Sequence, residues 1–297
     1  MINFRYHVVS IIGMFIALAV GVVLGAGPLQ SRIHAGVNAS STSTATDPQL
    51  SAQAEAEAAG LKALASSTLT GSLTGAKVAL VVLPGASDDD VTALRSTLTD
   101  AGASVVGRVT LSDNWQSTSM SQYRTTLSTT LASHLSSGAA KTASADGVVG
   151  YSIVQVLTST GSETDLLRQI LTDASTPIMT IDEDPAGAAT TIVAVGPRAQ
   201  AVASNGASPA AVSASSDAWV GLAQAVGSTS GVLVGDASTH DAMITSVRAS
   251  GTAVTTVDSV GTTLAAVDTA LALSTPATGA RAFGVGNGAQ SVIPSAK

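Results

Sequence analysis

The stretch Lys77-Val78-Ala79-Leu80-Val81-Val82-Leu83 is a short, almost wholly apolar run, and the turn residues 84–87 follow it directly. Runs of this kind are typical of strands that are buried on both faces, as in a parallel sheet. A helix is predicted next, with one apolar face and a glycine at its end: Val91, Leu94, Leu98, Ala101 and Gly102. Residues 104–111 supply a second strand, so the order strand, helix, strand predicts a right-handed βαβ unit.

The same alternation continues to the end of the chain. Helical spacing of apolar residues recurs at 120–135, 148–157, 164–171, 213–226, 241–249 and 262–273. Further short strands are predicted at 177–181, 190–195, 231–234, 253–257 and 281–285. Strands that alternate with helices indicate a layered α/β domain with a mostly parallel sheet. We place this domain at residues 75–297 and expect it to be extracytoplasmic.

Upstream of this domain, residues 8–29 read VVSIIGMFIALAVGVVLGAGPL, with no ionisable side chain between His7 and Arg32. An α-helix needs about 20 apolar residues to cross a hydrocarbon core roughly 30 Å thick. We therefore predict a single transmembrane helix at 8–29, behind a cytoplasmic leader at 1–7. Two alternatives remain open, a cleaved signal peptide and a helix buried in a protein core.

Small residues recur every four positions inside this span, at Gly13, Ala17, Gly21 and Gly25. On a helix they form one stripe, in which Gly21 and Gly25 make a G-x-x-x-G pair. Small side chains let two helix backbones approach closely in lipid. The stripe therefore predicts a helix-packing face, and a homodimer or oligomer formed through it.

The orientation of the span is predicted from segment lengths, because only Arg5 and Arg32 flank it with positive charge. A very short leader before a long chain indicates a single-pass signal anchor in the cell membrane, with the N-terminus in the cytoplasm and the bulk outside. The absence of cysteine fits export. The net charge of −7 offers no basic surface, so we predict no nucleic-acid partner.

Residues 30–74 differ in composition from the segments on either side. The run at 39–46 contains only Ala, Ser and Thr, which is typical of a flexible tether. Asp47 and Pro48 then fit the N-cap and first residue of a helix. A heptad-like seam follows and predicts a short stalk helix, with a coiled coil as the alternative: Leu50, Ala54, Glu57, Leu61, Leu64 and Thr68.

Acidic residues follow several of the predicted strands, at 88–90, 182–184, Asp236 and Asp258. Ligands of α/β sheets bind at the carboxyl ends of the strands, so one interpretation is a site for a divalent cation or a magnesium-bound phosphate. We prefer the structural alternative. The first turn of a helix favours carboxylates, and 88–90 lie where a helix is predicted to begin.

The chain offers few ligands for a transition metal. Copper(I) prefers Cys or Met sulfur, with imidazole next, whereas this chain has no cysteine, five methionines and four histidines. One spacing is suggestive, because Asp236, His240 and Met243 follow each other about one helical turn apart. They are weak metal candidates, and the alternative is a surface histidine beside a core methionine.

Motifs for nucleotide binding or catalysis are missing from the sequence. Gly284, Gly286 and Gly288 form G-x-G-x-G, but no helix is predicted after them to present its amino end to a phosphate. The G-x-x-x-x-G-K-[S/T] and G-x-S-x-G patterns are absent, and His134 and His240 lack a recognisable nucleophile context. We predict no catalytic residues, no bound cofactor and no enzymatic activity.

Three stretches of the chain resemble the actinobacterial copper transporter MctB family. They are FIALAVGVVLG at 15–25, PGASDDDV at 84–91 with its continuation through 101–103 to 109–111, and GNGAQSV at 286–292. The likeness spans nearly the full length. The chain departs from the family pattern in its stalk, where Ser, Thr and Ala stand in place of a charged coiled coil.

This resemblance implies an envelope protein with a role in copper homeostasis or efflux, for which copper is cargo. An outer-envelope location is also implied. Because relatives are linked to cell separation beside peptidoglycan hydrolases, the resemblance also implies an alternative function: a non-enzymatic, membrane-tethered interaction module that regulates an envelope partner. The residues alone slightly favour this module, since soft copper ligands are scarce.

Overall fold

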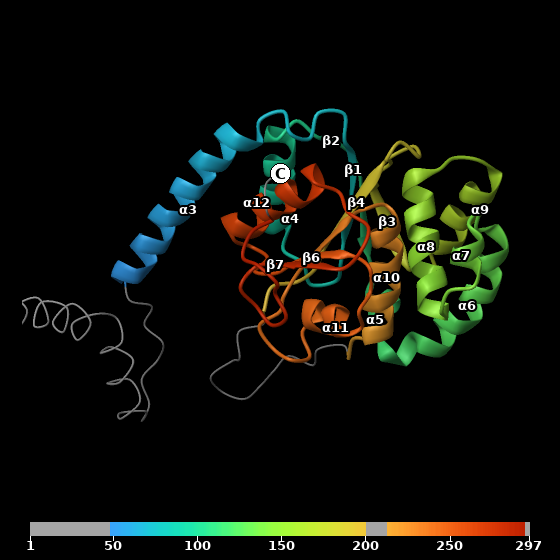
Figure 1. Cartoon of the computed structure of the whole chain (residues 1–297). Helices are drawn as coiled ribbons and strands as arrows, with labels where there is room; N and C mark the ends of the chain where they lie inside the picture. Colours follow the sequence, from blue (N-terminus) through green and yellow to red (C-terminus); the bar gives the residue numbers. More distant parts are fainter. Residues whose placement is uncertain (1–47, 200–212, 295–297) are drawn as a thin grey trace, which may run out of the picture. The chain divides into compact units, whose positions relative to one another are not determined.

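The structure of the chain, a computed structural model, describes residues 48–199 and 213–294 (Figure 1). The predicted leader, transmembrane helix, small-residue stripe and tether lie outside these residues. Within the described ranges, no helix is long and apolar enough to cross a membrane. The chain divides into two compact units, residues 1–54 and 55–297, and the second contains the whole sheet.

The second unit is built on one seven-stranded sheet in the order β3-β2-β1-β4-β5-β6-β7. Its strands are β1 (Lys77–Val82), β2 (Ser104–Leu111), β3 (Met179–Glu183), β4 (Thr191–Val195), β5 (Val232–Val234), β6 (Thr255–Val257) and β7 (Arg281–Phe283). Neighbouring strands pair in parallel, except that β3 runs antiparallel to β2 at one edge. The predicted α/β fold with a mostly parallel sheet is therefore confirmed.

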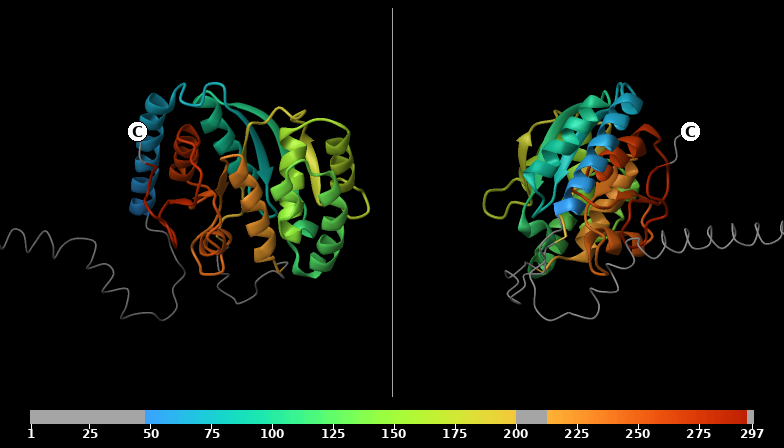
Figure 2. Two further views of the ribbon diagram at one scale, coloured as in Figure 1. Left: turned by 45° about the vertical axis from the view of Figure 1, so that its right-hand side comes forward. Right: turned by 90° about the vertical axis from the view of Figure 1, so that its left-hand side faces the viewer.

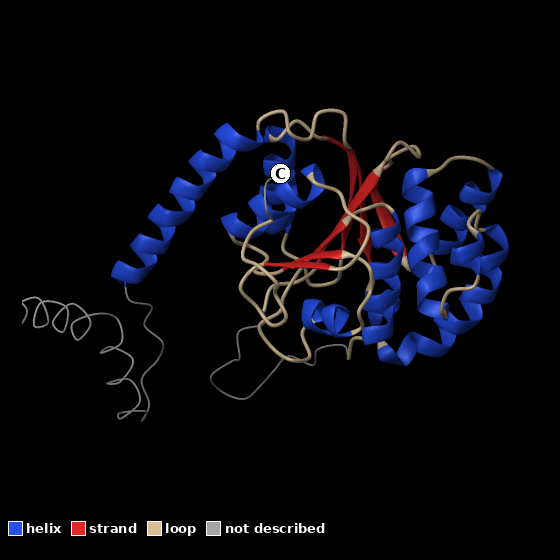
Figure 3. Ribbon diagram, viewed as in Figure 1, coloured by secondary structure: helices blue, strands red, loops and turns tan. Residues whose placement is uncertain are grey.

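The strands of the sheet run between the two groups of helices (Figure 3). The apolar run at β1 is buried on both faces of this sheet, as its sequence predicts. Its side chains alternate between two hydrophobic cores: Ala79, Val81 and Leu83 enter one, and Val78, Leu80 and Val82 enter the other. Full burial of a valine or leucine side chain contributes about 1.5–3 kcal/mol. This single strand therefore stabilises both layers of the domain.

Helices cover both faces of the sheet (Figure 2). The face that we call the α8 face carries α5 (Asp113–Gln116), α6 (Ser121–His134), α7 (Gly138–Lys141), α8 (Ala145–Thr158), α9 (Ser162–Leu171), α10 (Ser216–Ser228) and α11 (Met243–Ala249). The opposite face, the α12 face, carries α3 (Pro48–Leu69), α4 (Asp88–Asp100) and α12 (Thr263–Ser274). The longer helices agree with their predicted positions to within about one turn.

The connection through α12 differs from the other parallel crossovers. The chain passes from β1 to β2 over the α12 face, and from β4 to β5 and β5 to β6 over the α8 face in the opposite direction along the sheet. These three crossovers therefore share one hand. The step from β6 to β7 uses the α12 face and has the other hand. It begins with left-handed backbone at Ser259 (φ 61°) and Gly261 (φ 87°).

The helices α8 and α10 cross at two glycines. A Cβ atom added at Gly150 would lie 2.6 Å from the carbonyl oxygen of Gly221, and one added at Gly221 would lie 2.4 Å from the carbonyl carbon of Asp146. The two backbones therefore touch directly, because neither helix has a side chain at the crossing.

The predicted stalk helix is confirmed as α3, which begins at Pro48. Its last turns pack into the core of the α12 face through Ala65 and Leu69. Two residues of the predicted heptad seam face solvent instead, since Leu50 is 63% exposed and Leu64 is 68% exposed. The alternative, a coiled coil formed through this seam, stays a prediction.

One expectation about the acidic residues is wrong. The sequence places residues 182–184 at the carboxyl ends of the parallel strands. However, β3 is antiparallel, so it ends on the side of the sheet where the parallel strands begin. There Glu183 pairs with Arg95, with 2.7 Å between Oε2 and Nη2, and Asp184 pairs with Arg168 at 2.6 Å. The Arg95 guanidinium, mainly through its hydrogen bonds, holds the pKa of Glu183 below its ordinary value.

Candidate functional site

A cleft of about 610 Å³ lies at the carboxyl ends of β4 to β7, the edge where α/β sheets bind ligands. Its lining includes Arg198, Asp236, Ser238, Asp258, Ser259, Val285 and Asn287. Asp236 and Asp258 therefore meet here, as their positions after predicted strands indicate. We take this cleft as the candidate functional site of the described residues.

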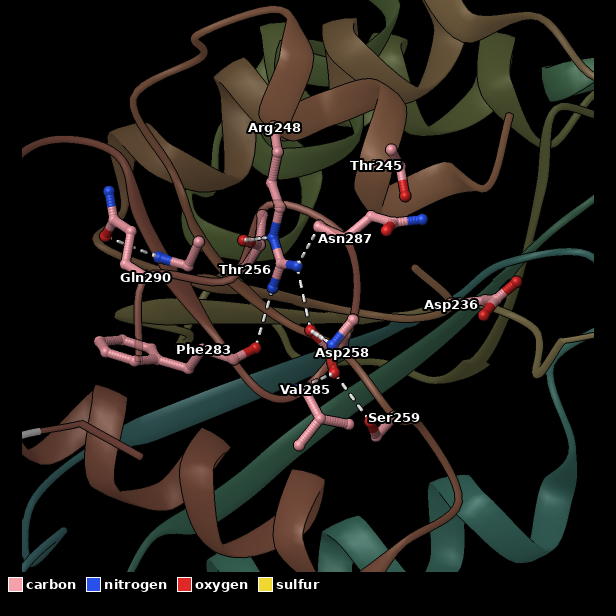
Figure 4. Close-up of polar contacts among 12 residues, drawn as sticks. Asp236, Thr245, Arg248, Thr256, Asp258, Ser259, Phe283, Val285, Asn287 and Gln290 are labelled. Atoms are coloured by element: carbon pink, nitrogen blue, oxygen red, sulfur yellow. Dashed lines mark hydrogen bonds and ion pairs between the residues drawn. The ribbon is translucent and has the colours of Figure 1, made fainter. Parts of the chain in front are cut away.

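Asp258 follows β6 and is only 1% exposed, yet its carboxylate is surrounded by donors (Figure 4). Oδ1 accepts hydrogen bonds from the Ser259 hydroxyl at 2.7 Å and the Val285 amide at 2.9 Å. Oδ2 accepts from the Gly286 amide and from Arg248 Nη1, both at 3.0 Å. Burial alone would raise the pKa of Asp258, but these hydrogen bonds hold it below its ordinary value. Asp258 is therefore a buried carboxylate that accepts four hydrogen bonds from protein donors.

Arg248, from the last turn of α11, braces three segments of the chain (Figure 4). Its Nε donates to Thr256 Oγ1 at 3.0 Å, Nη1 donates to the Asn287 carbonyl at 2.7 Å, and Nη2 donates to the Phe283 carbonyl at 2.8 Å. Its side chain is 7% exposed. Burial lowers the pKa of this guanidinium, while its contact with Asp258 opposes that shift. Arg248 thus ties α11 to β6 and to the chain after β7.

The glycines of G-x-G-x-G have a structural explanation at this site. Gly284 has φ 120°, and a Cβ atom there would lie 2.1 Å from Asp258 Oδ1. The loop amides that follow it point at a carboxylate from the same chain. Nucleotide motifs direct such amides at a phosphate, whereas here Asp258 already occupies the position. The absence of a dinucleotide site stays a prediction.

The acidic residues after β1 begin a helix, as the structural alternative predicts. Asp88, Asp89 and Asp90 form the first turn of α4. Asp88 also pairs with Arg108 at 2.6 Å, and Asp90 accepts from Arg198 Nε at 2.7 Å. The Arg198 guanidinium therefore joins α4 to the loop after β4. The helix start and these two ion pairs together account for Asp88 and Asp90.

The three weak metal candidates differ in their surroundings. Asp236 accepts hydrogen bonds from the Ser238 amide at 2.8 Å and the Ser238 hydroxyl at 3.0 Å, and His240 is exposed. Met243 is 4% exposed, and Cβ atoms added at Gly196 or Gly235 would fall within 2.5 Å of its methyl group. Packing between these glycines accounts for the Met243 side chain. A metal held by Asp236 and His240 stays a prediction.

Residues 48–199 and 213–294 contain no group of three or more His, Cys, Asp or Glu side chains arranged to hold a metal ion. On the α8 face, a histidine and a carboxylate do lie together: His134 Nδ1 is 2.5 Å from Glu163 Oε2. This pair lies on α6 and α9, away from the carboxyl-edge cleft, and both side chains are partly exposed.

The fold and the site define a class of protein: an α/β domain with a mostly parallel sheet, helices on both faces, and a cleft at the carboxyl ends of its strands. Two carboxylates beside this cleft, Asp90 and Asp258, are paired with arginines of the same chain. A family model described as copper transport outer membrane protein, MctB, matches residues 1–294. The chain therefore belongs to the MctB family, and the resemblance seen in the sequence is confirmed. A search of curated proteins gives no match.

Proposed function

We propose that this chain is a single-pass envelope protein that acts in copper homeostasis or efflux. The observation that carries the proposal is the family match over residues 1–294, because it includes both the apolar span and the α/β domain. Copper is then cargo, and the protein binds no resident cofactor and performs no enzymatic reaction. Residues 8–29 anchor it with the N-terminus in the cytoplasm and the domain at 75–297 outside, or in the outer envelope that the family description names.

The copper role is tested in a strain that lacks the gene. We expect the deletion strain to accumulate more copper and to be more sensitive to it than the parent. The intact chain should restore both properties. If His240 contributes a ligand, His240→Ala should fail to complement, whereas His134→Ala, a histidine paired with Glu163 away from the cleft, should complement fully. Normal copper content in the deletion strain contradicts the proposal.

The alternative function is a non-enzymatic interaction module that regulates an envelope partner, such as a hydrolase in cell separation. Two observations favour it: the chain has no cysteine, and Asp90 and Asp258 at the carboxyl edge are each paired with an arginine of the same chain. Such pairing leaves little affinity for a hard or soft cation. The same deletion strain separates the two functions, because this one predicts a defect in cell separation with unchanged copper content.

Self-association through the predicted transmembrane helix belongs to both functions. In an insertion-reporter assay, Gly21→Leu is expected to weaken dimerisation, because a leucine in the stripe keeps the two backbones apart. Val22→Leu, one position off the stripe, is the matched control and should leave the signal unchanged. Equal signals for Gly21→Leu and the unmodified helix would show that the stripe is not the contact face.

A further inference from the structure

Asp268 is the one ionisable residue of α12, and it is fully buried beneath the sheet. Neither of its carboxylate oxygens has a hydrogen-bond partner among the described residues. A buried carboxylate without partners is costly when charged, and such a group ordinarily becomes neutral instead. Burial, together with the negative charge of Asp258, raises the pKa of Asp268 to about 7.

The two acids flank one connection of the chain. Asp258 ends β6, the loop at 259–262 follows, and Asp268 lies in the second turn of α12. Asp258 is charged and receives four hydrogen bonds, whereas Asp268 receives none. Two neighbouring carboxyl groups with such different surroundings favour a state in which one is ionised and the other is protonated.

The loop at 259–262 forms a wall between two cavities. Val260 lines both the carboxyl-edge cleft and a groove of about 420 Å³ between α3, α4 and α12. The non-glycine residue Ser259 adopts a left-handed backbone in this loop, with φ 61°. Such a conformation costs of order 1–3 kcal/mol and persists only when its surroundings enforce it. The conformation of this loop therefore depends on the groups packed around it.

Other charges on the elements around α12 do not neutralise Asp268. The elements packed against it, or bonded to it, carry these charged groups: Glu55, Glu57 and Lys62 on α3; Asp88, Asp89, Asp90, Arg95 and Asp100 on α4; Arg198 after β4; Asp236 after β5; Asp258 after β6 with its partner Arg248; and Arg281 on β7. Arg281 donates to the carbonyls of Ala272 and Thr275 at the far end of α12. Among these groups only Asp258 shifts the pKa of Asp268, and it acts in the same direction as burial.

We propose that the proton on Asp268 keeps the loop at 259–262 and the residues 284–287 in the closed form, which is the arrangement seen in the structure, and that loss of this proton widens the cleft. The free-energy cost of a buried negative charge on Asp268 falls most directly when water enters beside the loop. That movement also loosens the Val285 and Gly286 amides from Asp258. The proposal concerns access to the cleft and does not depend on copper being the cargo.

The direction of the pH dependence follows from linkage. In the closed form Asp268 binds a proton up to about pH 7, whereas a solvated aspartate releases it near pH 4. The advantage of the closed form is therefore complete below about pH 4 and is lost as the pH rises toward 7. Opening should increase roughly tenfold per pH unit between about pH 5 and 6.5, and should level off above about 7.

The experiment is amide hydrogen exchange on the full-length chain between pH 5 and 8, with Asp268→Asn as the permanently neutral variant. The ratio of exchange rates, unmodified chain over variant, cancels the chemical pH dependence of exchange. For peptides covering 259–274 and 284–287, we expect this ratio to rise roughly tenfold per pH unit between about pH 5 and 6.5 and to level off above about pH 7. It should stay constant for peptides of α8 and α10. Asp100→Asn, on the exposed side of α4, is the control and should behave like the unmodified chain.

Two results would overturn the proposal. The first is a ratio at 259–274 that does not change with pH, and the second is an equal rise in α8 and α10, which would indicate global loosening. If Asp268→Asn does not fold, exchange at 259–274 relative to α8 within the unmodified chain gives the same test. In that comparison a constant ratio across the pH range also contradicts the proposal.

Discussion

Replacing Arg248 with methionine is expected to destabilise the α/β domain by about 3–5 kcal/mol, because the variant leaves the Asp258 carboxylate buried without its cationic partner. Methionine keeps much of the side-chain volume, so the loss reports charge and hydrogen bonds rather than an empty space. Four donated bonds, to Thr256, Asp258, Phe283 and Asn287, disappear together. Urea unfolding of the full-length chain in detergent, followed by the fluorescence of Trp115 and Trp219, measures the change.

The matched control is Arg95→Met. This arginine also pairs with a carboxylate, Glu183, but both side chains are well exposed, at 37% and 43%. Exposed pairs contribute about 0–1 kcal/mol. Similar losses of stability in the two variants would mean that burial does not decide the strength of these ion pairs. The Arg248–Asp258 pair would then stabilise the domain no more than the exposed Arg95–Glu183 pair does.

Gly221→Ala is expected to cost about 3 kcal/mol, at the upper end of the range for overpacked cores. The added methyl group would lie 2.4 Å from the Asp146 carbonyl carbon and 2.6 Å from the Gly147 amide nitrogen. Both atoms belong to the backbone of α8, so no side chain can move aside. Helices α8 and α10 must separate, and the core of the α8 face opens with them. The midpoint of urea unfolding measures this effect.

Gly60→Ala is the companion variant for that experiment. Gly60 lies in α3, and a Cβ atom there meets nothing within 4 Å. Alanine should therefore stabilise the helix by about 1 kcal/mol relative to glycine. Opposite signs for the two substitutions would show that contact at the α8–α10 crossing, and not glycine content, sets the outcome. A neutral Gly221→Ala would contradict the crossing described here.

The sequence predicts most of this fold because the strands are unambiguous. The run at 77–83 has the continuous apolar pattern of a doubly buried strand, and β4 and β5 are shorter apolar runs that are also bounded by turn residues. The direction of β3 could not be predicted. It depends on the path of the chain through α5 to α9, and nothing in the local pattern at 177–184 records that path. This is why the acidic residues 182–184 were placed at the wrong edge.

The candidate site was predictable only in part. The position of Asp236 and Asp258 follows from the rule for parallel sheets, and the spacing of Gly284 and Gly286 signals a close approach of backbone to some group. The identity of that group could not be read from the sequence, because Asp258 lies far back in the chain. Arg248 looks like an ordinary helix-end cation in the sequence, and its burial depends on segments that come later.

The sequence does carry a signal for the unusual position of Asp268. The helix at 263–274 is apolar around its whole circumference, which is typical of a buried helix. Asp268, its single carboxylate, is therefore predicted to be buried whichever face of the helix it lies on. The pattern could have marked Asp268 as unusual, but not as a neighbour of Asp258, because the opposite hand of the β6–β7 connection decides which face of the sheet α12 covers.

The brace around Asp258 also sets an order of events during biosynthesis. The amides of Val285 and Gly286, and the carbonyls of Phe283 and Asn287 that hold Arg248, are all synthesised after β6. Until they emerge from the ribosome, the Asp258 carboxylate after β6 is uncompensated, and the edge formed by β6 and β7 is unfinished. A chain threaded unfolded through a translocon would thus complete its sheet only after residue 287 had reached the far side.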